Sequence, residues 1–245
     1  MCAPFVIPAK AGIQSFPTFL DSRLRGNDIK KADILFFACY NNTIPHYAGI
    51  VLRKENVMTG KNEIYQFKVT LKDSSPTIWR RFQVVGNISL CKMHEIIQIV
   101  MGWTDSHLHQ FIDKGIFYGN SEDDDFRGTE ILDEKKFKIN QILTEQKQKI
   151  VYEYDFGDSW EHELVLEKII SKDKKINTPI CIEGERACPP EDCGGIGGYE
   201  DLLETLKKPD DPEYENLIEW LDEDFDPNIF NLNEINRKLK RIKNT

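Results

Sequence analysis

Alternating apolar and polar positions predict that the orderly part of the chain begins with β-strands. From Tyr65 to Leu71 every second residue is apolar, which is the period of a half-buried strand. Residues 78–85 form a second such segment, and Pro76 favours a turn between the two. Two hairpins are predicted further along, one formed by residues 107–112 with 115–118 and one by residues 149–154 with 162–168.

Helical periodicity occurs once among these strands and again beyond residue 171. Ser89 is a suitable cap for a helix that ends at Gly102 and carries one apolar stripe. The stripe consists of Leu90, Met93, Ile96, Ile97, Val100 and Met101. Three later helices are expected: one around Tyr199–Leu206, one opened by Asp211 and Pro212 that buries Leu217, Trp220 and Leu221, and one over residues 232–242. The order predicts an α+β fold, with antiparallel strands and hairpins, one early helix and a helical C-terminal region.

The first sixty residues differ from the rest in charge and pattern. They hold seven Lys/Arg and four Asp/Glu, against 25 and 37 in the remainder, and they lack sustained periodicity. The blocks 6–14 and 20–28 resemble peptides translated from a palindromic bacterial DNA repeat. We therefore predict a read-through or poorly ordered tail over residues 1–60, with Met58 as a candidate start, and a single domain over 61–245. A targeting peptide is the alternative, but Pro4 and Pro8 interrupt its apolar stretch.

Composition narrows the class of protein. The 245 residues carry a net charge of −9, and 40% are hydrophobic, which favours a soluble globular protein that we place in the cytoplasm. Apolar runs fall short of the ~20 residues that span a membrane. Residues 183–226 hold sixteen acids and three bases, which form either a solvated face or a docking surface for a basic partner. Arg80, Arg81 and the C-terminal Lys/Arg group are the basic concentrations available for nucleic acid.

Cysteine and histidine residues supply a candidate metal site. Cys188 and Cys193 do not have the spacing of a CxxC zinc knuckle, so further ligands must come from elsewhere. Thiolates with His109 and His162 suit tetrahedral zinc, which is the cofactor that this set favours. The alternative is that these residues are buried thiols and hydrogen-bonded core histidines.

Carboxylates near a tight turn supply a candidate acid/base site. Asp155 and Asp158 lie on the tight turn Asp155-Phe-Gly-Asp158, and His162 follows it. Glu191 and Asp192 lie on a Gly/Pro-rich loop. These five residues are the candidates for hydrolytic or transferase chemistry. Asp and Gly also suit a hairpin turn for backbone reasons alone. Residues 194–198, rich in glycine, indicate either an anion-binding helix start or an inter-element turn.

Six motifs in order carry a resemblance to a known family. They are Trp79-Arg80-Arg81, Ser106-His-Leu-His-Gln-Phe111, Tyr154-Asp-Phe-Gly-Asp-Ser-Trp-Glu-His162, Ala187-Cys-Pro-Pro-Glu-Asp-Cys-Gly-Gly195, Gly198-Tyr199 and Asp224-Phe-Asp-Pro227. Residues 62–242 resemble the family named after the third open reading frame of the root-inducing plasmid pRiA. The resemblance implies a compact α+β fold, and some relatives carry labels that link them to transposon resolvases or mobile elements. It places the expected site among His109, Asp155, Asp158, Trp160, His162, Glu191 and Asp192.

Three functions follow as hypotheses of different classes. The first is a non-catalytic binding or adaptor module of a mobile-element-associated family that recognises a protein partner, because an acidic helical region accompanies no complete catalytic set. The second is a zinc-dependent enzyme built on the His/Cys set. The third is a DNA-associated accessory protein that binds through Arg80 and Arg81.

Overall fold

A computed structural model describes residues 63–120, 130–170, 178–221 and 225–242. All of these lie in one compact unit that spans residues 52–245. The predicted tail over residues 1–60 and the candidate start at Met58 lie outside the described residues.

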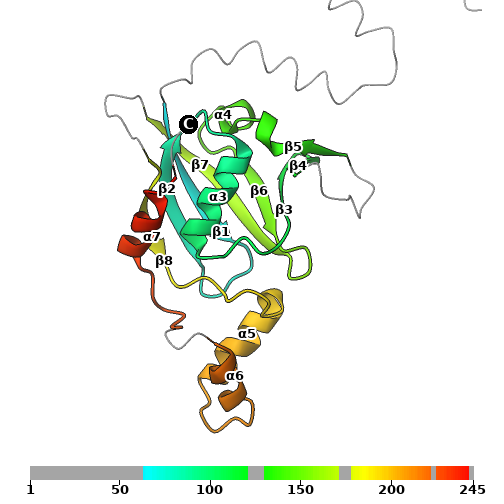
Figure 1. Ribbon diagram of the computed structural model, residues 1–245, viewed down its shortest axis with the longest axis vertical. Helices are drawn as coiled ribbons and strands as arrows, with labels where there is room; N and C mark the ends of the chain where they lie inside the picture. Colours follow the sequence, from blue (N-terminus) through cyan, green and yellow to red (C-terminus); the bar gives the residue numbers. More distant parts are fainter. Residues whose placement is uncertain (1–62, 121–129, 171–177, 222–224, 243–245) are drawn as a thin grey trace, which may run out of the picture. The chain divides into compact units, whose positions relative to one another are not determined.

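The described residues form one eight-stranded sheet in the order β5-β4-β3-β6-β7-β1-β2-β8 (Figure 1). Neighbouring strands are antiparallel, except that β4 and β5 are parallel. The strands are β1 (Ile64–Leu71), β2 (Trp79–Val85), β3 (His109–Asp113), β4 (Ile116–Gly119), β5 (Ile131–Asp133), β6 (Lys149–Tyr154), β7 (Trp160–Ile170) and β8 (Ile180–Glu185). Together with the helices below, this confirms the predicted α+β fold.

The helix α3 (Leu90–Met101) lies across one face of this sheet (Figure 1). The Ser89 hydroxyl accepts the Lys92 N–H at 3.1 Å, and Gly102 ends the helix with φ +112°. That positive φ is the left-handed conformation that glycine adopts most readily. The predicted apolar stripe is fully buried against the sheet, where Phe67 of β1 and Phe82 of β2 pack at a ring-centroid distance of 5.9 Å.

Among the described residues, two short helical elements lie between β5 and β6, and three helices follow the last strand. A 3-10 turn, η1 (Glu134–Lys136), and α4 (Ile139–Ile142) follow β5. The later helices are α5 (Gly195–Leu206), α6 (Tyr214–Trp220) and α7 (Leu232–Leu239). In the part of the chain that the structure describes, none of the helices combines the length and apolarity required to cross a bilayer.

The edge strand β8 lies in a region where helices alone were expected. It pairs with β2, and Asn236 of α7 bonds the backbone of Cys181 on both sides, donating to its carbonyl at 2.8 Å and accepting its N–H at 2.9 Å. Ile180 and Ile182 are apolar but exposed, so β8 lacks the usual alternation of buried apolar and exposed polar residues. The sequence therefore gives little indication of a strand here. The Asn236 side chain of α7 satisfies backbone groups on the free edge of β8.

Two other local predictions are wrong in detail. The first hairpin turns at Lys114 and Gly115, with φ of +52° and +80°, one residue later than expected. Positive φ at both central residues matches the twist of the paired strands. The helix α6 starts at Tyr214 instead of Pro212, and Trp220 is 50% exposed instead of buried.

Candidate functional site

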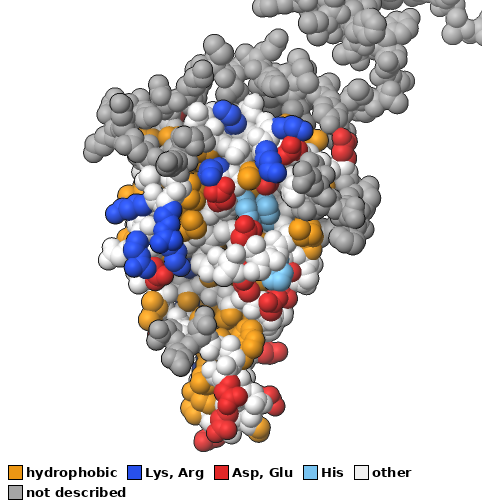
Figure 2. Space-filling view, viewed as in Figure 1, with side chains coloured by type: hydrophobic (Ala, Val, Ile, Leu, Met, Phe, Trp, Pro, Cys, Tyr) orange, Lys and Arg blue, Asp and Glu red, His pale blue; other side chains and the backbone are white. Residues whose placement is uncertain are grey.

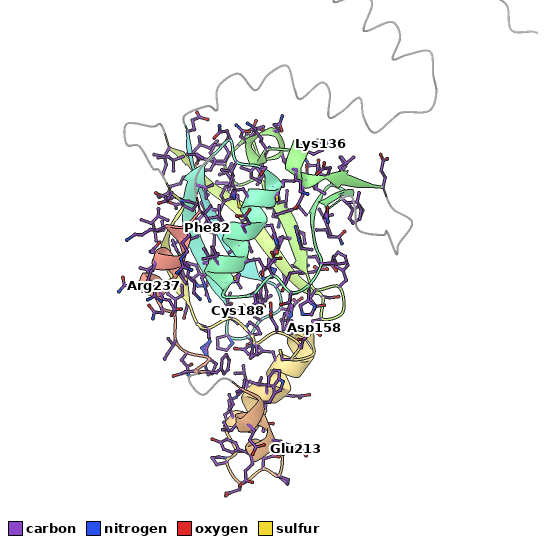
Figure 3. The ribbon with its side chains drawn as sticks, viewed as in Figure 1. Phe82, Lys136, Asp158, Cys188, Glu213 and Arg237 are labelled. Atoms are coloured by element: carbon purple, nitrogen blue, oxygen red, sulfur yellow. The ribbon has the colours of Figure 1, made fainter. Side chains whose placement is uncertain are left out.

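Three loops meet at one end of the sheet, and we call this region the motif edge. They are residues 103–108 before β3, 155–159 between β6 and β7, and 189–194 before α5. The Trp103 indole donates to the Pro189 carbonyl at 3.2 Å, which joins the first loop to the third. The Gly194 N–H donates to the Asp158 carboxylate at 3.1 Å, which joins the third to the second where α5 begins (Figure 3).

Glu191 is the centre of the hydrogen bonds in the motif edge. The Tyr154 hydroxyl donates to it at 2.6 Å, and the Thr104 N–H donates to the same oxygen at 3.1 Å. Burial opposes the charge of Glu191, but these bonds outweigh burial and lower its pKa. Burial and the bond to Glu191 raise the pKa of Tyr154. The tyrosine therefore keeps its proton and holds the two loops together.

His107 lies between two carboxylates of the motif edge. Its Nδ1 is 3.6 Å from Asp155 Oδ2, and its Nε2 is 3.2 Å from Asp192 Oδ1. The Nε2 contact with Asp192 lacks hydrogen-bond geometry, so this buried nitrogen atom has no hydrogen-bond partner. One ligand atom from each of the three residues lies within 4.8 Å of the other two. We call these three residues the His107 cluster.

A second group of histidines and acids lies beneath α3, and we call it the inner cluster. The rings of His94 and His109 stack at a centroid distance of 3.4 Å with an angle of 6° between their planes. His94 pairs with Asp105 at 2.8 Å and with the Tyr152 hydroxyl at 2.8 Å, and His109 pairs with the buried Glu134 at 2.8 Å. Burial, together with the neighbouring His109, lowers the pKa of His94 to about 4. His94 is therefore neutral at pH 7, and both of its nitrogen atoms are bonded.

The four predicted zinc ligands are distributed over different places. His109 belongs to the inner cluster, whereas His162 lies fully buried in β7 with its ring centroid 5.1 Å from that of Trp103. Within the described ranges, two groups of three residues bring metal-ligand atoms within 4.8 Å, and neither group contains Cys188 or Cys193. Both groups combine histidine with carboxylates (Figure 2 shows histidines beside acidic side chains on one face).

Both cysteines of the predicted set are protonated thiols in their present surroundings. Burial raises the pKa of Cys193 to about 12 and raises that of Cys188 further still. Zinc binds the thiolate form, so metal binding here would have to displace these protons.

The five acid/base candidates divide into two sets. Asp155, Asp158, Glu191 and Asp192 all lie in the motif edge. His162 does not join them. Its Nδ1 donates to the Tyr152 carbonyl at 3.2 Å, its Nε2 has no partner, and burial lowers its pKa to about 4.

Of the predicted nucleic-acid residues, Arg80 is buried, and Arg81 is partly exposed but paired with acids. Arg80 is 2% exposed, and it donates to the carbonyls of Val100, Trp79 and Glu185. Arg81 pairs with Glu167 and Glu183 on neighbouring strands. Phosphate binding needs accessible, unpaired cations, so this placement does not favour DNA binding through the pair.

Close packing accounts for the glycines at the start of α5. A Cβ atom at Gly198 would lie 1.8 Å from the Cys193 carbonyl oxygen, and one at Gly195 would lie 2.6 Å from that of Asp158. The Asp158 carboxylate takes the N–H of Gly194 at the start of this helix. The protein's own anion thus occupies the position where an external anion was considered.

Sequence reasoning missed several residues that complete the two clusters. His94 and Glu134 lie on α3 and η1, which have no motif in common with His109. His107, Thr104 and Tyr154 belong to or adjoin recognised motifs, so the signal for them was their position beside His109 and Asp155. The motif edge could have been inferred by grouping the motifs by loop rather than by residue type.

The chain is similar to a described protein family and to individual relatives. A family model described as plasmid pRiA4b ORF-3-like protein matches residues 63–234, which include the whole motif edge. The uncharacterized protein y4hQ of Sinorhizobium fredii (strain NBRC 101917 / NGR234) is 34% identical over 149 residues, 60% of this chain and 74% of that relative. The crystal structure of MM3350, a protein of unknown function from Methanosarcina mazei Go1, aligns with a TM-score of 0.60 and 38% identity over 69% of this chain and 96% of that one. The predicted resemblance is confirmed.

Proposed function

The chain belongs to the plasmid pRiA4b ORF-3-like family, and from that premise we propose that it is a non-catalytic binding module that docks a basic protein segment. The docking surface is the acidic arm, which we define as α5, α6 and their connection, residues 195–220. The observation that carries the proposal is that α6 buries none of its residues and exposes Ile218 and Trp220.

Exposed apolar side chains of this size support a role in contact with a partner. Trp220 is 50% exposed and Ile218 is 45% exposed, although Leu217 and Leu221 on the same segment pack toward the core. A tryptophan side chain contributes strongly to binding affinity when an interface buries it. A helix as short as α6 is marginally stable without tertiary packing, so contact with a partner would also stabilise it.

The charge of the arm supports a basic partner. Eight Asp/Glu residues and two lysines occur between residues 195 and 220. Both lysines, Lys207 and Lys208, pair with Glu204, so they do not offset the acids of α6. Acidic and hydrophobic side chains lie together on the arm (Figure 2). Such a surface matches an amphipathic segment with a basic face and an apolar face.

An array of basic amphipathic peptides, with acid-substituted counterparts of identical apolar pattern, tests this proposal. The full chain should bind members of the basic set and none of the acidic set, and added salt should weaken the binding. Trp220→Ser should reduce affinity by at least about tenfold, which is the cost of losing one aromatic anchor. Ile182→Ser, on the exposed edge of β8, is the matched control and should bind normally. Equal binding of both peptide sets, or an unaffected Trp220→Ser variant, would reject the proposal.

The two other hypotheses stay predictions, each with its own test. A zinc-dependent enzyme that uses His109, His162, Cys188 and Cys193 requires stoichiometric zinc that is lost in a folded His162→Ala variant. A DNA-associated role requires binding that weakens steeply with salt in a shift assay.

A further inference from the structure

The His107 cluster has the spacing that a single metal ion needs. Atoms bound about 2.1 Å from zinc lie roughly 3–4 Å from one another. The His107 Nε2 atom lies 3.2 Å from Asp192 Oδ1, and one ligand atom from each of His107, Asp155 and Asp192 lies within 4.8 Å of the other two. Small side-chain rotations would bring these atoms to coordination distance.

Hydrogen bonding leaves the ligand atoms of this cluster free. The Nε2 atom of His107 is buried without a partner, an arrangement that costs free energy in a folded protein. Asp155 Oδ1 accepts the Gly157 N–H at 2.9 Å, so the other oxygen, Oδ2, is directed to His107. The inner cluster differs, because both nitrogens of His94 have hydrogen-bond partners.

The charge around the cluster favours a cation. Asp155, Asp158, Glu191 and Asp192 gather in the motif edge. Among the residues that the structure describes, no lysine or arginine forms an ion pair with any of these four. A bound divalent ion would offset this excess of negative charge.

Hydrogen bonds around the His107 cluster hold the loops that carry its three residues. Tyr154 and Thr104 hold Glu191, the neighbour of Asp192, and Asp158 holds Gly194. The Asp155 N–H donates to the Leu108 carbonyl at 2.8 Å, which fixes that turn beside the residue after His107. Such outer bonds orient metal ligands and strengthen metal binding.

From these observations we infer that His107, Asp155 and Asp192 bind one divalent transition-metal ion, of the Zn²⁺ or Mn²⁺ type. One imidazole nitrogen and two carboxylate oxygens suit borderline ions of this kind. Three protein ligands leave coordination positions for water or an oxygen-bearing ligand. The site shares no residue with the acidic arm, so it is independent of the proposed docking function.

Metal titration of the full chain after chelation and dialysis tests this inference, with ZnCl₂ alone and MnCl₂ alone as the probes. Calorimetry and elemental analysis should find one ion per chain, with a dissociation constant in the micromolar range or below. His107→Gln, Asp155→Asn and Asp192→Asn should each weaken binding by at least about tenfold. Asp192 is 73% exposed, so the last variant will fold, which its urea midpoint without metal will verify.

Two matched variants distinguish this site from its competitors. His109→Gln alters the inner cluster and Cys193→Ser alters the predicted His/Cys set, and both should keep normal metal affinity. Binding that disappears in Cys193→Ser but survives in Asp155→Asn would overturn the inference in favour of the His/Cys site. An absence of stoichiometric binding would also overturn it.

Discussion

The inner cluster and the His107 cluster contain the same kinds of residues in opposite conditions. In the inner cluster, the buried His94 has a partner on each nitrogen, and His109 is paired with Glu134. In the His107 cluster, a buried nitrogen has no partner although two carboxylates lie nearby. The two clusters therefore differ in the state of their hydrogen bonds and not in residue type, and this contrast supports the proposed metal site.

The most severe test of this contrast is to remove one carboxylate from each cluster. Glu134 is buried and paired with His109, so Glu134→Ala should lower the free energy of unfolding by about 3 kcal/mol, because it leaves a buried imidazole unpaired. Asp192→Ala should change it by less than about 0.5 kcal/mol, because Asp192 is largely exposed. Urea unfolding at pH 7 measures both values, and similar losses in the two variants would contradict the contrast.

Acid should destabilise the inner cluster before most carboxylates titrate. The pKa of His94 is lowered to about 4 by burial, so between about pH 6.5 and pH 4 the unfolded chain binds a proton that the folded chain refuses. Stability should therefore fall with decreasing pH, by roughly 2 kcal/mol at pH 5 for such a histidine. The fully buried His162, whose pKa is also lowered to about 4, adds a similar loss.

Single substitutions can assign this loss of stability at low pH to individual histidines. His94→Gln should show a smaller decrease in urea midpoint from pH 7 to pH 5, relative to its own value at pH 7. His107→Gln, the matched change in the other cluster, should retain the decrease of the unmodified chain. An unchanged pH dependence in His94→Gln would show that burial of this ring is not its cause.

A moderate effect is expected at the bonds that support the motif edge. Tyr154→Phe removes the hydroxyl that joins Glu191 to the Ser106 N–H, and should cost about 1 kcal/mol of stability. Hydrogen exchange at the Ser106 and Thr104 amides should accelerate more than exchange in α3. Uniform acceleration throughout the sheet would show that Tyr154 supports the core as a whole instead of the loops.

The smallest effect separates hydrogen bonding from charge in the inner cluster. Asp105 is 57% exposed and accepts a hydrogen bond from His94, and an asparagine oxygen can accept the same bond. Asp105→Asn should therefore change the free energy of unfolding by less than about 0.5 kcal/mol. A loss several times larger would show that the carboxylate charge is essential to the stacked histidines.

Local patterns sufficed for most of the fold. Ser89 and Gly102 marked both ends of α3, and the alternation from Tyr65 onward marked β1, because these signals depend on neighbouring residues alone. The edge strand β8 was missed because its alternation is weak and Asn236, far along the chain, satisfies its backbone. Exposure of Trp220 was also missed, because amphipathic spacing does not reveal whether a partner surface exists within the same chain.

The sequence by itself determined most of the elements, the α+β class, the family and the loops in which four acidic site candidates lie, because each of these follows from local pattern or ordered motifs. The tertiary structure decided which side chains meet. It placed His109 beside His94 and Glu134, and it placed His107 between Asp155 and Asp192. The physical reason is that burial and hydrogen bonding depend on strand order and loop packing, which bring together residues that are far apart in the chain.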